Sequence, residues 1–314
     1  MNKQYLALLV AAVSIAGVLF SAQETKVDAF DQWKGQFAPN WAPEQELYRR
    51  TIFEQNLAKI EAHNADPTQT YTMGVNQFTV LTQEEFEHIY LNAIPPAMLS
   101  MVPPMDNEEM PNAEIDWSAK GKVTPVKNQG QCGSCWAFSA TGVAESQALL
   151  ESDKTVDLSE QQLVDCTRDM GNYGCSGGWP YNALKYMKDG IAYEADYPYH
   201  ARNQNCAMNH GPFKISDYTS VTGCAALANA LTSRPISITA DAGRWSSYRG
   251  GIFNTCGTQI NHAILMVGVT DSYWKVKNSW GTGWGENGYI RLALGNTCGV
   301  CQLASPYVNS IVSY

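Results

Sequence analysis

Two cysteines stand together where the sequence predicts the start of a helix. Cys132 and Cys135 are separated by Gly133 and Ser134, and a segment without proline follows from Trp136 to Leu150. The N-terminus of a helix carries roughly half a positive charge, which favours a thiolate over a thiol. Because the thiolate is the nucleophilic form of cysteine, we interpret Cys135 as a candidate nucleophile.

A nucleophilic thiolate needs a base and a group that orients the base. His262 directly precedes the apolar run Ala263–Gly268, which predicts a strand that holds the histidine rigidly at its mouth. Asn278 follows a second predicted strand. If a hairpin joins the two strands, the Asn278 amide can hold the imidazole while Trp280 shields that bond from water. A single histidine is more often an ordinary core residue, so this interpretation depends on Cys135 and Asn278 together.

The chain has nine cysteines, all of them beyond residue 130. In an oxidising compartment most of them form disulfides, and an odd number leaves at least one unpaired. Cys132 and Cys135 also have the spacing of a redox pair or of half a zinc site, whose other half would be Cys298 and Cys301. The candidate histidine and asparagine argue against zinc, and the βαβ context of a thioredoxin-like pair is absent. We therefore expect no metal and no cofactor.

Residues 1–22 have the composition of a secretory signal, with Lys3 near the start and an apolar run from Tyr5 to Phe20. The run is shorter than the roughly 20 residues that span a bilayer, so we favour a signal over a membrane anchor. The net charge of -9 is concentrated in residues 23–110, which hold fourteen Asp and Glu against five Lys and Arg. This asymmetry indicates two parts with different fates. The absence of a basic tract argues against nucleic acid as a partner.

The acidic part predicts helices followed by a linker. Glu44–Asn64 has no Pro or Gly and has apolar residues at helical spacing, and Tyr71–Phe78 is predicted to be extended. Thr82 and Glu85 predict a capping box at the start of a short helix. Residues 93–112 contain five prolines, which is typical of an extended linker that proteases can reach.

Beyond Pro111 the sequence predicts an α+β fold with two lobes. Further helices are predicted at Ser159–Asp165 and Ala225–Leu231. The predicted strands are Pro235–Ala240, Ala263–Val269, Tyr273–Lys277 and Gly288–Leu294. Helices early and strands late favour one mainly helical lobe, which carries Cys135, and one barrel-like sheet, which carries His262 and Asn278.

At these residues the chain resembles the papain and cathepsin family of cysteine proteases. Gln129–Ser139 resembles the active-site segment of the family, and Cys135, His262 and Asn278 match its catalytic triad in order. Residues 278–285, Asn-Ser-Trp-Gly-Thr-Gly-Trp-Gly, match a third signature. The resemblance implies that Gln129 and the Cys135 N–H form the oxyanion hole. It also implies a papain-like fold with the active-site cleft between the two lobes.

The first third resembles the inhibitory propeptide of the same family. The helical signature of the cathepsin L type is complete, with Glu46, Arg50, Phe53, Asn56, Ile60 and Asn64. In the motif that follows, Gly74, Asn76 and Phe78 are present, but Val80 stands where the family has Asp. That Asp is associated with acid-triggered processing, so the substitution bears on the pH response. No long insertion precedes Cys166, which favours the L branch over the B branch.

The resemblance implies three disulfides and a free Cys135. The implied pairs are Cys132–Cys175, Cys166–Cys206 and Cys256–Cys298. Cys224 and Cys301 are not standard in the family. Counting alone leads to the hypothesis that these two form a fourth disulfide.

The resemblance also implies the substrate-binding residues. Gly177 and Gly178 match glycines whose backbone pairs with an extended peptide, and Trp280 borders the same site. The S2 pocket would be lined by Trp179, Pro180, Thr239, Ile260, Ala263 and Leu303. Leu303 occupies the pocket floor, where some relatives carry Glu. An apolar floor leaves a basic side chain unpaired, so we expect a preference for aliphatic or aromatic P2 residues.

These observations predict a zymogen with a signal at 1–22, an inhibitory propeptide at 23–110 and a papain-like peptidase domain at 111–314. We expect acid to trigger removal of the propeptide near residues 105–113, because its carboxylates lose charge and its salt bridges to the peptidase domain weaken.

The function implied is that of an endopeptidase acting on protein and peptide substrates, with its own propeptide as inhibitor. We expect a monomer that binds no nucleic acid and, after signal removal, no membrane. The expected location is a lysosome, a digestive vacuole or the exterior of the cell. The alternative is a catalytically silent relative that binds peptides, and the presence of Cys135, His262 and Gln129 argues against it.

Overall fold

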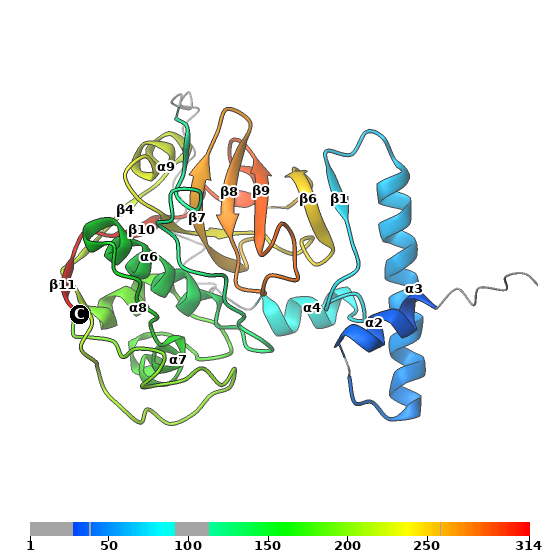
Figure 1. Cartoon of the computed structure of the whole chain (residues 1–314), viewed down its shortest axis with the longest axis horizontal. Coiled ribbons are helices and arrows are strands. Elements are labelled where there is room, and N and C mark those ends of the chain that lie inside the picture. Colours follow the sequence, from blue (N-terminus) through cyan, green and yellow to red (C-terminus); the bar gives the residue numbers. More distant parts are fainter. Residues whose placement is uncertain (1–27, 38, 92–112, 258) are drawn as a thin grey trace, which may run out of the picture. The chain divides into compact units, whose positions relative to one another are not determined.

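Strand β7 (His262–Val269) is buried along its entire length and lies between two hydrophobic cores. Its side chains alternate between the two faces of the sheet, so Ala263, Leu265 and Val267 belong to one core and the residues between them to the other. A continuous apolar run is what a strand buried on both faces requires. The computed structural model, which describes residues 28–37, 39–91, 113–257 and 259–314, shows two lobes that share this strand (Figure 1).

The sheet lobe contains a seven-stranded sheet in which β7 is a central member. The strand order is β1-β6-β9-β8-β7-β2, and β5 also pairs with β7. The strands are β1 (Tyr71–Met73), β2 (Ile115–Asp116), β5 (Ile236–Ala240), β6 (Tyr248–Phe253), β8 (Tyr273–Lys277) and β9 (Tyr289–Ala293). Only the β6–β9 pair among these is parallel. Helix α9 (Cys224–Leu231) contributes Leu227 and Leu231 to the core of this lobe.

The helical lobe is built around α6 (Cys135–Ser152), whose residues from Cys135 to Leu149 are all buried. A helix that is buried on all sides needs small and apolar residues around its whole circumference, as α6 has. The shorter helices of this lobe are α7 (Glu160–Cys166), the 3-10 helix η1 (Arg168–Met170) and α8 (Pro180–Met187). Ser159 caps α7, and Pro180 begins α8, where its missing N–H costs nothing.

The C-terminal segment returns to the helical lobe through two small antiparallel sheets. Strand β10 (Ser305–Val308) pairs with β4 (Tyr218–Val221), and β11 (Ile311–Ser313) pairs with β3 (Lys214–Ile215). The 3-10 helix η2 (Thr297–Gly299) precedes them. As a result, Val308 lies in the helical core although its strand follows the sheet lobe in sequence.

The predicted propeptide attaches to the sheet through a strand and a helix. Helix α3 (Pro43–Ala65) leads to β1, which extends the edge of the sheet by pairing with β6, and then to α4 (Gln83–Tyr90). The capping box at α4 is present: the Thr82 hydroxyl accepts from the Glu85 N–H at 3.1 Å, and the Glu85 carboxylate accepts from the Thr82 N–H at 2.9 Å.

The chain divides into two compact units between Ala42 and Pro43, and all elements above belong to the second. The first contains helix α2 (Ala29–Phe37), at whose start Asp28 accepts a hydrogen bond from the Phe30 N–H at 2.9 Å. Its aromatic rings contact one another, with centroid distances of 5.0 Å for Trp33–Phe37 and 5.7 Å for Trp33–Trp41.

Most of the predicted elements are confirmed within a residue or two at each end. The extended piece predicted at Tyr71–Phe78 is the exception, because β1 ends at Met73. The Asn76 side chain accepts from the Phe78 N–H at 2.8 Å and turns the chain there. Helix α8 and strand β6 were not predicted. The predicted signal and linker lie outside the described residues.

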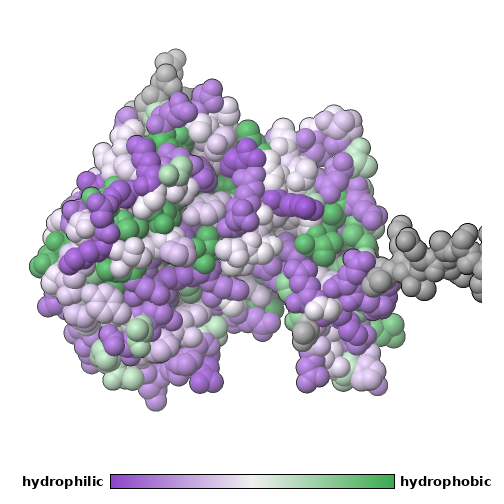
Figure 2. Space-filling model, in the orientation of Figure 1, coloured by the Kyte–Doolittle hydropathy of each residue, from purple (hydrophilic) through white to green (hydrophobic). Residues whose placement is uncertain are grey.

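Hydrophobic residues on the face shown in Figure 2 form small groups among hydrophilic ones. This pattern fits a chain whose large aromatic side chains, such as Trp136, Trp245 and Trp274, are fully buried. Within the described ranges, we find no helix that is both long and apolar enough to cross a membrane.

Four disulfides cross-link the peptidase part of the chain. They are Cys132–Cys175, Cys166–Cys206, Cys224–Cys301 and Cys256–Cys298. Three of these are the pairs that the family resemblance implies, and Cys224–Cys301 is the pair suggested by counting. Cys135 is left as the free cysteine. The zinc alternative is wrong, because Cys132, Cys298 and Cys301 are bonded to other sulfurs.

Candidate active site

Cys135 is the first residue of α6 and its side chain is fully buried. The Cys132–Cys175 disulfide and a hydrogen bond from the Gly133 N–H to the Cys175 carbonyl at 2.9 Å fix the segment just before it. Burial raises the pKa of the Cys135 thiol to about 12. In the precursor the sulfur is therefore a neutral thiol, although the position is one that the sequence predicts to favour a thiolate.

His262 is held by Asn278 in a defined orientation. The His262 Nε2 and Asn278 Oδ1 atoms are 2.8 Å apart, and the same Oδ1 accepts from the Ser279 N–H at 2.8 Å. Because the Ser279 N–H must donate, the acceptor is the Asn278 oxygen and His262 Nε2 carries the proton. The other ring nitrogen, Nδ1, is buried and has no hydrogen-bond partner among the described residues.

Trp280 covers the imidazole as the sequence predicts. The two rings stack with a centroid distance of 4.8 Å and an interplanar angle of 28°. Burial lowers the pKa of His262 to about 4, and the bond to Asn278 opposes that change. His262 is therefore a neutral imidazole in the precursor above that pH.

The Cys135 sulfur lies at the end of β7 that carries His262. The backbone amide of Ala263, the residue after His262, interacts with the Cys135 sulfur and partly counters the rise in its pKa. Cys135 and Ala263 also belong to the same hydrophobic core. The fold thus brings a free thiol, an imidazole with an unpartnered Nδ1 and an orienting carboxamide together from α6, β7 and the end of β8.

Gln129 is fully buried, and its amide orientation is fixed on both sides. The Ser279 hydroxyl donates to Gln129 Oε1 at 2.7 Å, so the Nε2 group must face the other way. That Nε2 donates to the Cys132 carbonyl at 3.0 Å and to the Tyr90 carbonyl at 3.3 Å. A backbone carbonyl at the end of α4 thus occupies the donor that is predicted to stabilise an oxyanion.

Two further side chains support this arrangement and were missed by the sequence analysis. Ser279 contacts both Asn278 and Gln129. It belongs to the motif at residues 278–285, but the sequence alone predicts no role for it. Tyr199 donates from its hydroxyl to the Gln129 carbonyl at 2.8 Å and lies 2.6 Å from the Ser134 hydroxyl. Nothing in the polar loop around Tyr199 signals this role in the sequence.

The predicted propeptide packs aromatic rings around Trp280. Phe78, Phe86 and Tyr90 lie edge-on to Trp280, with centroid distances of 5.3, 5.4 and 6.5 Å. The Gln77 side-chain amide donates to the Trp280 carbonyl at 2.8 Å. The ring that shields His262 is therefore also the surface to which α4 and the turn before it bind.

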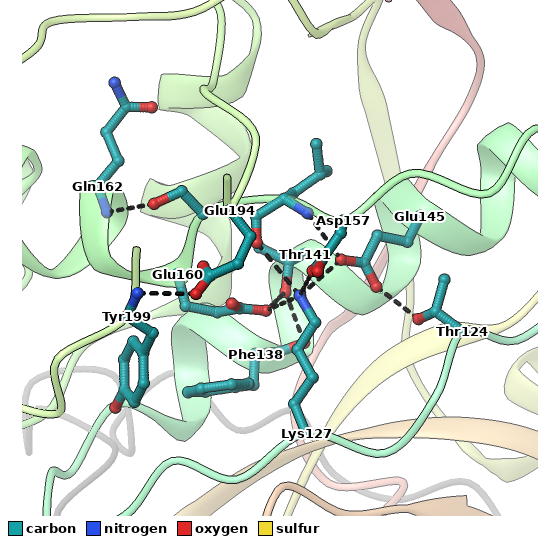
Figure 3. Close-up of polar contacts among 12 residues, drawn as sticks. Thr124, Lys127, Phe138, Thr141, Glu145, Asp157, Glu160, Gln162, Glu194 and Tyr199 are labelled. Atoms are coloured by element: carbon teal, nitrogen blue, oxygen red, sulfur yellow. Dashed lines mark hydrogen bonds and ion pairs between the residues drawn. The ribbon is translucent and has the colours of Figure 1, made fainter. Parts of the chain in front are cut away.

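Lys127, two residues before Gln129, lies among three carboxylates, of which Glu145 and Glu160 are buried and Asp157 is exposed (Figure 3). Its ammonium is 2.8 Å from Glu145 of α6, 2.7 Å from Glu160 of α7 and 2.7 Å from Asp157. We call Lys127, Glu145, Asp157 and Glu160 the charge cluster. It ties both helices to the segment that carries Gln129.

The two buried carboxylates of the charge cluster are also satisfied by neutral donors. Thr124 donates to Glu145 at 2.5 Å, and Thr141 of α6 donates to Glu160 at 2.7 Å. In Figure 3, Glu194 points toward this cluster, and its carboxylate accepts from the Tyr199 N–H at 2.7 Å. Tyr199 thus links Glu194 to the Gln129 carbonyl.

Burial and pairing give the charge cluster unequal acidities. Burial opposes the charge of Lys127, but the Glu145 and Glu160 carboxylates outweigh it and raise the pKa of Lys127 well above its usual value. Burial would also raise the pKa of Glu145, yet Lys127 and Lys277 outweigh it and lower that pKa. Glu160 is different, because burial raises its pKa to about 7. Glu145 therefore carries the firm negative charge, while Glu160 titrates near neutrality.

The residues predicted to line the S2 pocket are brought together in part. Trp179, Ile260 and Leu303 form a separate small apolar cluster, and all three are buried. Thr239 and Ala263 face each other across the β5–β7 pair. Pro180 is buried at the start of α8, directly after Trp179, and is not a member of that apolar cluster.

The two predicted backbone-binding glycines have structural reasons of their own. Gly177 has a left-handed φ of 107°, which favours glycine. A Cβ on Gly178 would lie 2.6 Å from the Trp136 ring, so glycine is needed there to let Trp136 pack next to Cys135. The expected role of both glycines in binding a peptide backbone stays a prediction.

Comparison with known proteins agrees with this geometry. Residues 111–308 match the family described as papain family cysteine protease, and residues 30–86 match the cathepsin propeptide inhibitor domain. The chain belongs to the papain family of cysteine proteases. Both parts of the precursor are thus recognised separately.

The relatives of this papain-family chain include cathepsins of the L type. It is 42% identical to a cathepsin L-like proteinase of Fasciola hepatica, over 95% of this chain and 97% of the relative. It is 40% identical to cathepsin L 2 of Paramecium tetraurelia, over 88% of this chain and 90% of the relative.

Solved structures of precursor forms share the fold. The recombinant stem bromelain precursor aligns with a TM-score of 0.79 and 35% identity, covering 90% of this chain and 97% of its own. Procathepsin L 3 of the Tenebrio molitor larval midgut aligns with a TM-score of 0.79 and 36% identity, covering 88% and 97%. The protein is therefore a cathepsin L-type cysteine protease with a propeptide and a two-lobed papain-like fold, and no finding favours a catalytically silent relative.

Proposed function

We propose that this papain-family protease is an endopeptidase that hydrolyses peptide bonds through an acyl-enzyme on Cys135. The observation that carries the proposal is the His262–Asn278 bond at 2.8 Å, which leaves His262 Nδ1 without a described partner. This nitrogen belongs to the residue next to Ala263, whose amide interacts with the only free thiol found in the chain. A base oriented by a third group beside a nucleophile is the arrangement that covalent catalysis needs.

The reaction uses all four proposed catalytic residues. The Cys135 thiol gives its proton to His262, and the thiolate attacks the carbonyl carbon, so that a C–S bond forms while the carbonyl π electrons move to the oxygen. Gln129 Nε2 and the Cys135 N–H donate to that oxyanion. The C–N bond then breaks, and His262 gives its proton to the leaving amine. Water then gives a proton to His262 and attacks the thioester carbon, and the C–S bond breaks to release the acid and the Cys135 thiolate. Asn278 keeps the ring oriented throughout.

The precursor is inactive for two physical reasons in this proposal. The Tyr90 carbonyl takes the Gln129 donor, and the buried Cys135 and His262 are both neutral between their pKa values of about 12 and about 4. Opening the site admits water and substrate. Solvation then favours the thiolate–imidazolium pair that attacks the substrate.

We assign the parts of the chain as a signal at 1–22, a propeptide at 23–110 and a peptidase domain at 111–314, with processing near 105–113. Most of the processing region lies outside the described residues. We place the enzyme on the secretory route, with a lysosome, a digestive vacuole or the exterior as destination, because relatives include digestive cysteine proteinases of Homarus americanus. We propose that it acts as a monomer and binds no nucleic acid.

The substrate preference follows from the apolar S2 cluster. Trp179, Ile260 and Leu303 offer no charge to a basic P2 side chain, whose burial would be costly. We propose a preference for aliphatic and aromatic P2 residues. Faster cleavage of a P2-Arg peptide than of its P2-Leu counterpart would contradict this assignment.

The deciding experiment is a peptidase assay of acid-treated precursor, titrated with a thiol-directed epoxide. We expect activity to fall in proportion to labelling of Cys135. The matched control is the Cys135→Ala precursor, which should neither process itself nor cleave peptides. Hydrolysis by that variant, or full activity after complete labelling, would refute the proposal.

A further inference from the structure

The segment that carries Leu303 has a backbone that is unfavourable in isolation. Cys298 has a left-handed φ of 57°, and Gly299 follows with a φ of 75°. Such a φ is costly for a residue other than glycine. The segment Thr297–Leu303 therefore needs external contacts to hold its conformation.

Two disulfides attach this segment to different parts of the sheet lobe. Cys256–Cys298 ties its beginning to the chain after β6, and the Cys298 carbonyl accepts from the Asp241 N–H at 2.7 Å. Cys224–Cys301 ties its far end to the first residue of α9. Cys301 is buried, so its bridge belongs to the packed interior.

Leu303 lies between two fixed points. On one side, the Cys224–Cys301 bridge is reinforced by a hydrogen bond from the Gly223 N–H to the Cys301 carbonyl at 3.3 Å. On the other side, Ser305 begins β10 and pairs with Val221 of β4. The position of Leu303 is thus set by the disulfide and the strand pair that flank it.

The same segment shapes the wall opposite Trp179. Leu303 packs with Trp179 and Ile260, and it is 4% exposed. A Cβ on Gly299 would lie 2.5 Å from Ile260 Cδ1, so the backbone at Gly299 lies directly against that side chain. Any shift of Gly299–Leu303 would move both Ile260 and Leu303.

We propose that the Cys224–Cys301 disulfide determines P2 selectivity by fixing Gly299–Leu303 against Ile260. The proposal rests on the assignment of Leu303 and Ile260 to the S2 pocket. With the bridge, the pocket has one shape and discriminates between side chains by size. Without it, Leu303 adopts several positions and the discrimination falls, because specificity depends on walls that are held in place.

The test compares Cys224→Ala/Cys301→Ala with wild-type enzyme on peptides that differ only at P2. Active enzyme is counted by epoxide titration, and kcat/KM is measured for P2-Leu, P2-Phe and P2-Ala. We expect the Leu-to-Ala ratio to fall about tenfold, because one methylene of misfit in an apolar pocket is worth about tenfold or more in discrimination. The kcat for the P2-Ala peptide should stay within about twofold, because this side chain does not reach the pocket floor.

The control is Cys166→Ala/Cys206→Ala, which removes a bridge in the helical lobe that spans 40 residues, against 77 for Cys224–Cys301. It should lower the melting temperature and leave the P2 ratio unchanged. An unchanged ratio in the Cys224/Cys301 variant, or an equal loss for all peptides, would overturn the proposal. If that variant yields no titratable enzyme, Cys224→Ser/Cys301→Ser decides, because it removes the same bridge with side chains closer in size to cysteine; an unchanged ratio there also overturns the proposal.

A failure of the proposed function or of the S2 assignment would give a different result from a failure of the proposed role of the disulfide. Wild-type enzyme that cleaves no peptide, or that prefers P2-Arg, would refute the S2 assignment before any variant is compared. A wild-type preference for P2-Leu with an unchanged variant ratio would refute the role of the disulfide alone.

Discussion

The charge cluster and the aromatic contact around Trp280 both border the active site, yet opposite kinds of interaction hold them together. In the charge cluster, Lys127 meets three carboxylates within 2.8 Å. Around Trp280, the propeptide contributes the rings of Phe78, Phe86 and Tyr90. The first region joins parts of the peptidase domain to one another, and the second joins the propeptide to that domain.

The comparison shows how contacts within the peptidase domain can be permanent while the contact with the propeptide can be released. Buried charges require their partners in place, so the charge cluster locks α6 and α7 to the Gln129 segment. Rings contribute through contact area and carry no charge to titrate. The ion pair Arg49–Glu85 joins α3 to α4 inside the propeptide, so acid acts on that pair by loosening the propeptide itself.

The largest effect should come from Lys127→Met. This change leaves Glu145 and Glu160, each 1% exposed, without their cation. Breaking a buried pair in this way costs about 3–5 kcal/mol, so we expect most of the precursor to be lost in chemical denaturation or soluble expression. Lys188→Met is the control, because its partner Asp217 is exposed and the pair is worth less than about 1 kcal/mol. Similar losses in both variants would show that the buried pairs of Lys127 stabilise the protein no more than the exposed pair of Lys188 does.

Phe78→Ala should have the next largest effect, on the propeptide alone. Phe78 is 3% exposed, and the loss of such a side chain costs about 3 kcal/mol or more. We expect the precursor to be labelled at Cys135 by the epoxide about a hundredfold faster, and by the same factor at pH 5 and pH 7. Val75→Ala, at an exposed propeptide position, should change nothing. A strongly pH-dependent factor would show that titrating groups share in this contact.

Glu160→Gln should change the pH dependence of the stability of the charge cluster. Burial raises the pKa of Glu160 in the folded state from 4.5 to about 7. The contribution of its protonated form to stability is therefore fully present below pH 4.5 and is lost as the pH rises through 7. We expect the wild-type melting temperature to fall between pH 5 and pH 8, and the variant to lose much of that fall, worth at most about 3 kcal/mol.

Glu145→Gln is the matched control for this titration. The pKa of Glu145 is lowered, chiefly because Lys127 and Lys277 outweigh burial, so it is ionised across the same range. Its replacement should destabilise the protein at both pH values. Equal pH profiles for Glu160→Gln and wild type would show that Glu160 does not titrate as described.

Glu85→Gln should have the smallest effect. The glutamine can still accept from Thr82, so the capping box remains and only the charge opposite Arg49 is removed. Hydrogen bonds from Arg49 lower the pKa of Glu85 below 4.5, so the pair stabilises the propeptide above that pH and is lost as the pH falls through the lowered value.

We therefore expect Glu85→Gln to speed precursor processing by about threefold at pH 6, in line with a partly exposed pair worth under about 1 kcal/mol. The difference from wild type should shrink in strong acid. A difference that instead grows with acidity would place the acid trigger elsewhere.

The proposed catalytic residues could be predicted from the sequence because the features that mark them are local. A helix start at Cys135, a strand start at His262 and an asparagine after the next strand are readable from residue patterns, and the hairpin puts the last two together. The capping box at Thr82 was readable for the same reason. The resemblance to family motifs then predicted that the segment of Cys135 lies beside the segments of His262 and Asn278.

The contacts of Tyr199, Ser279 and the charge cluster could not be read in the same way. Glu145 stands in a helix where a charged residue normally faces water, and only the fold shows that α6 is buried all round. Tyr199 reaches Gln129 across seventy positions in sequence. Strands of two to four residues, such as β3 and β4, are too short to give a pattern, so their pairing depends on tertiary contacts.

The full burial of Cys135 also bears on how the folded precursor keeps its disulfides. The eight other cysteines are paired, and a disulfide exchanges partners only when a thiolate attacks it. With a pKa near 12, Cys135 offers almost none. Burial in the folded precursor therefore keeps the Cys135 sulfur out of disulfide exchange.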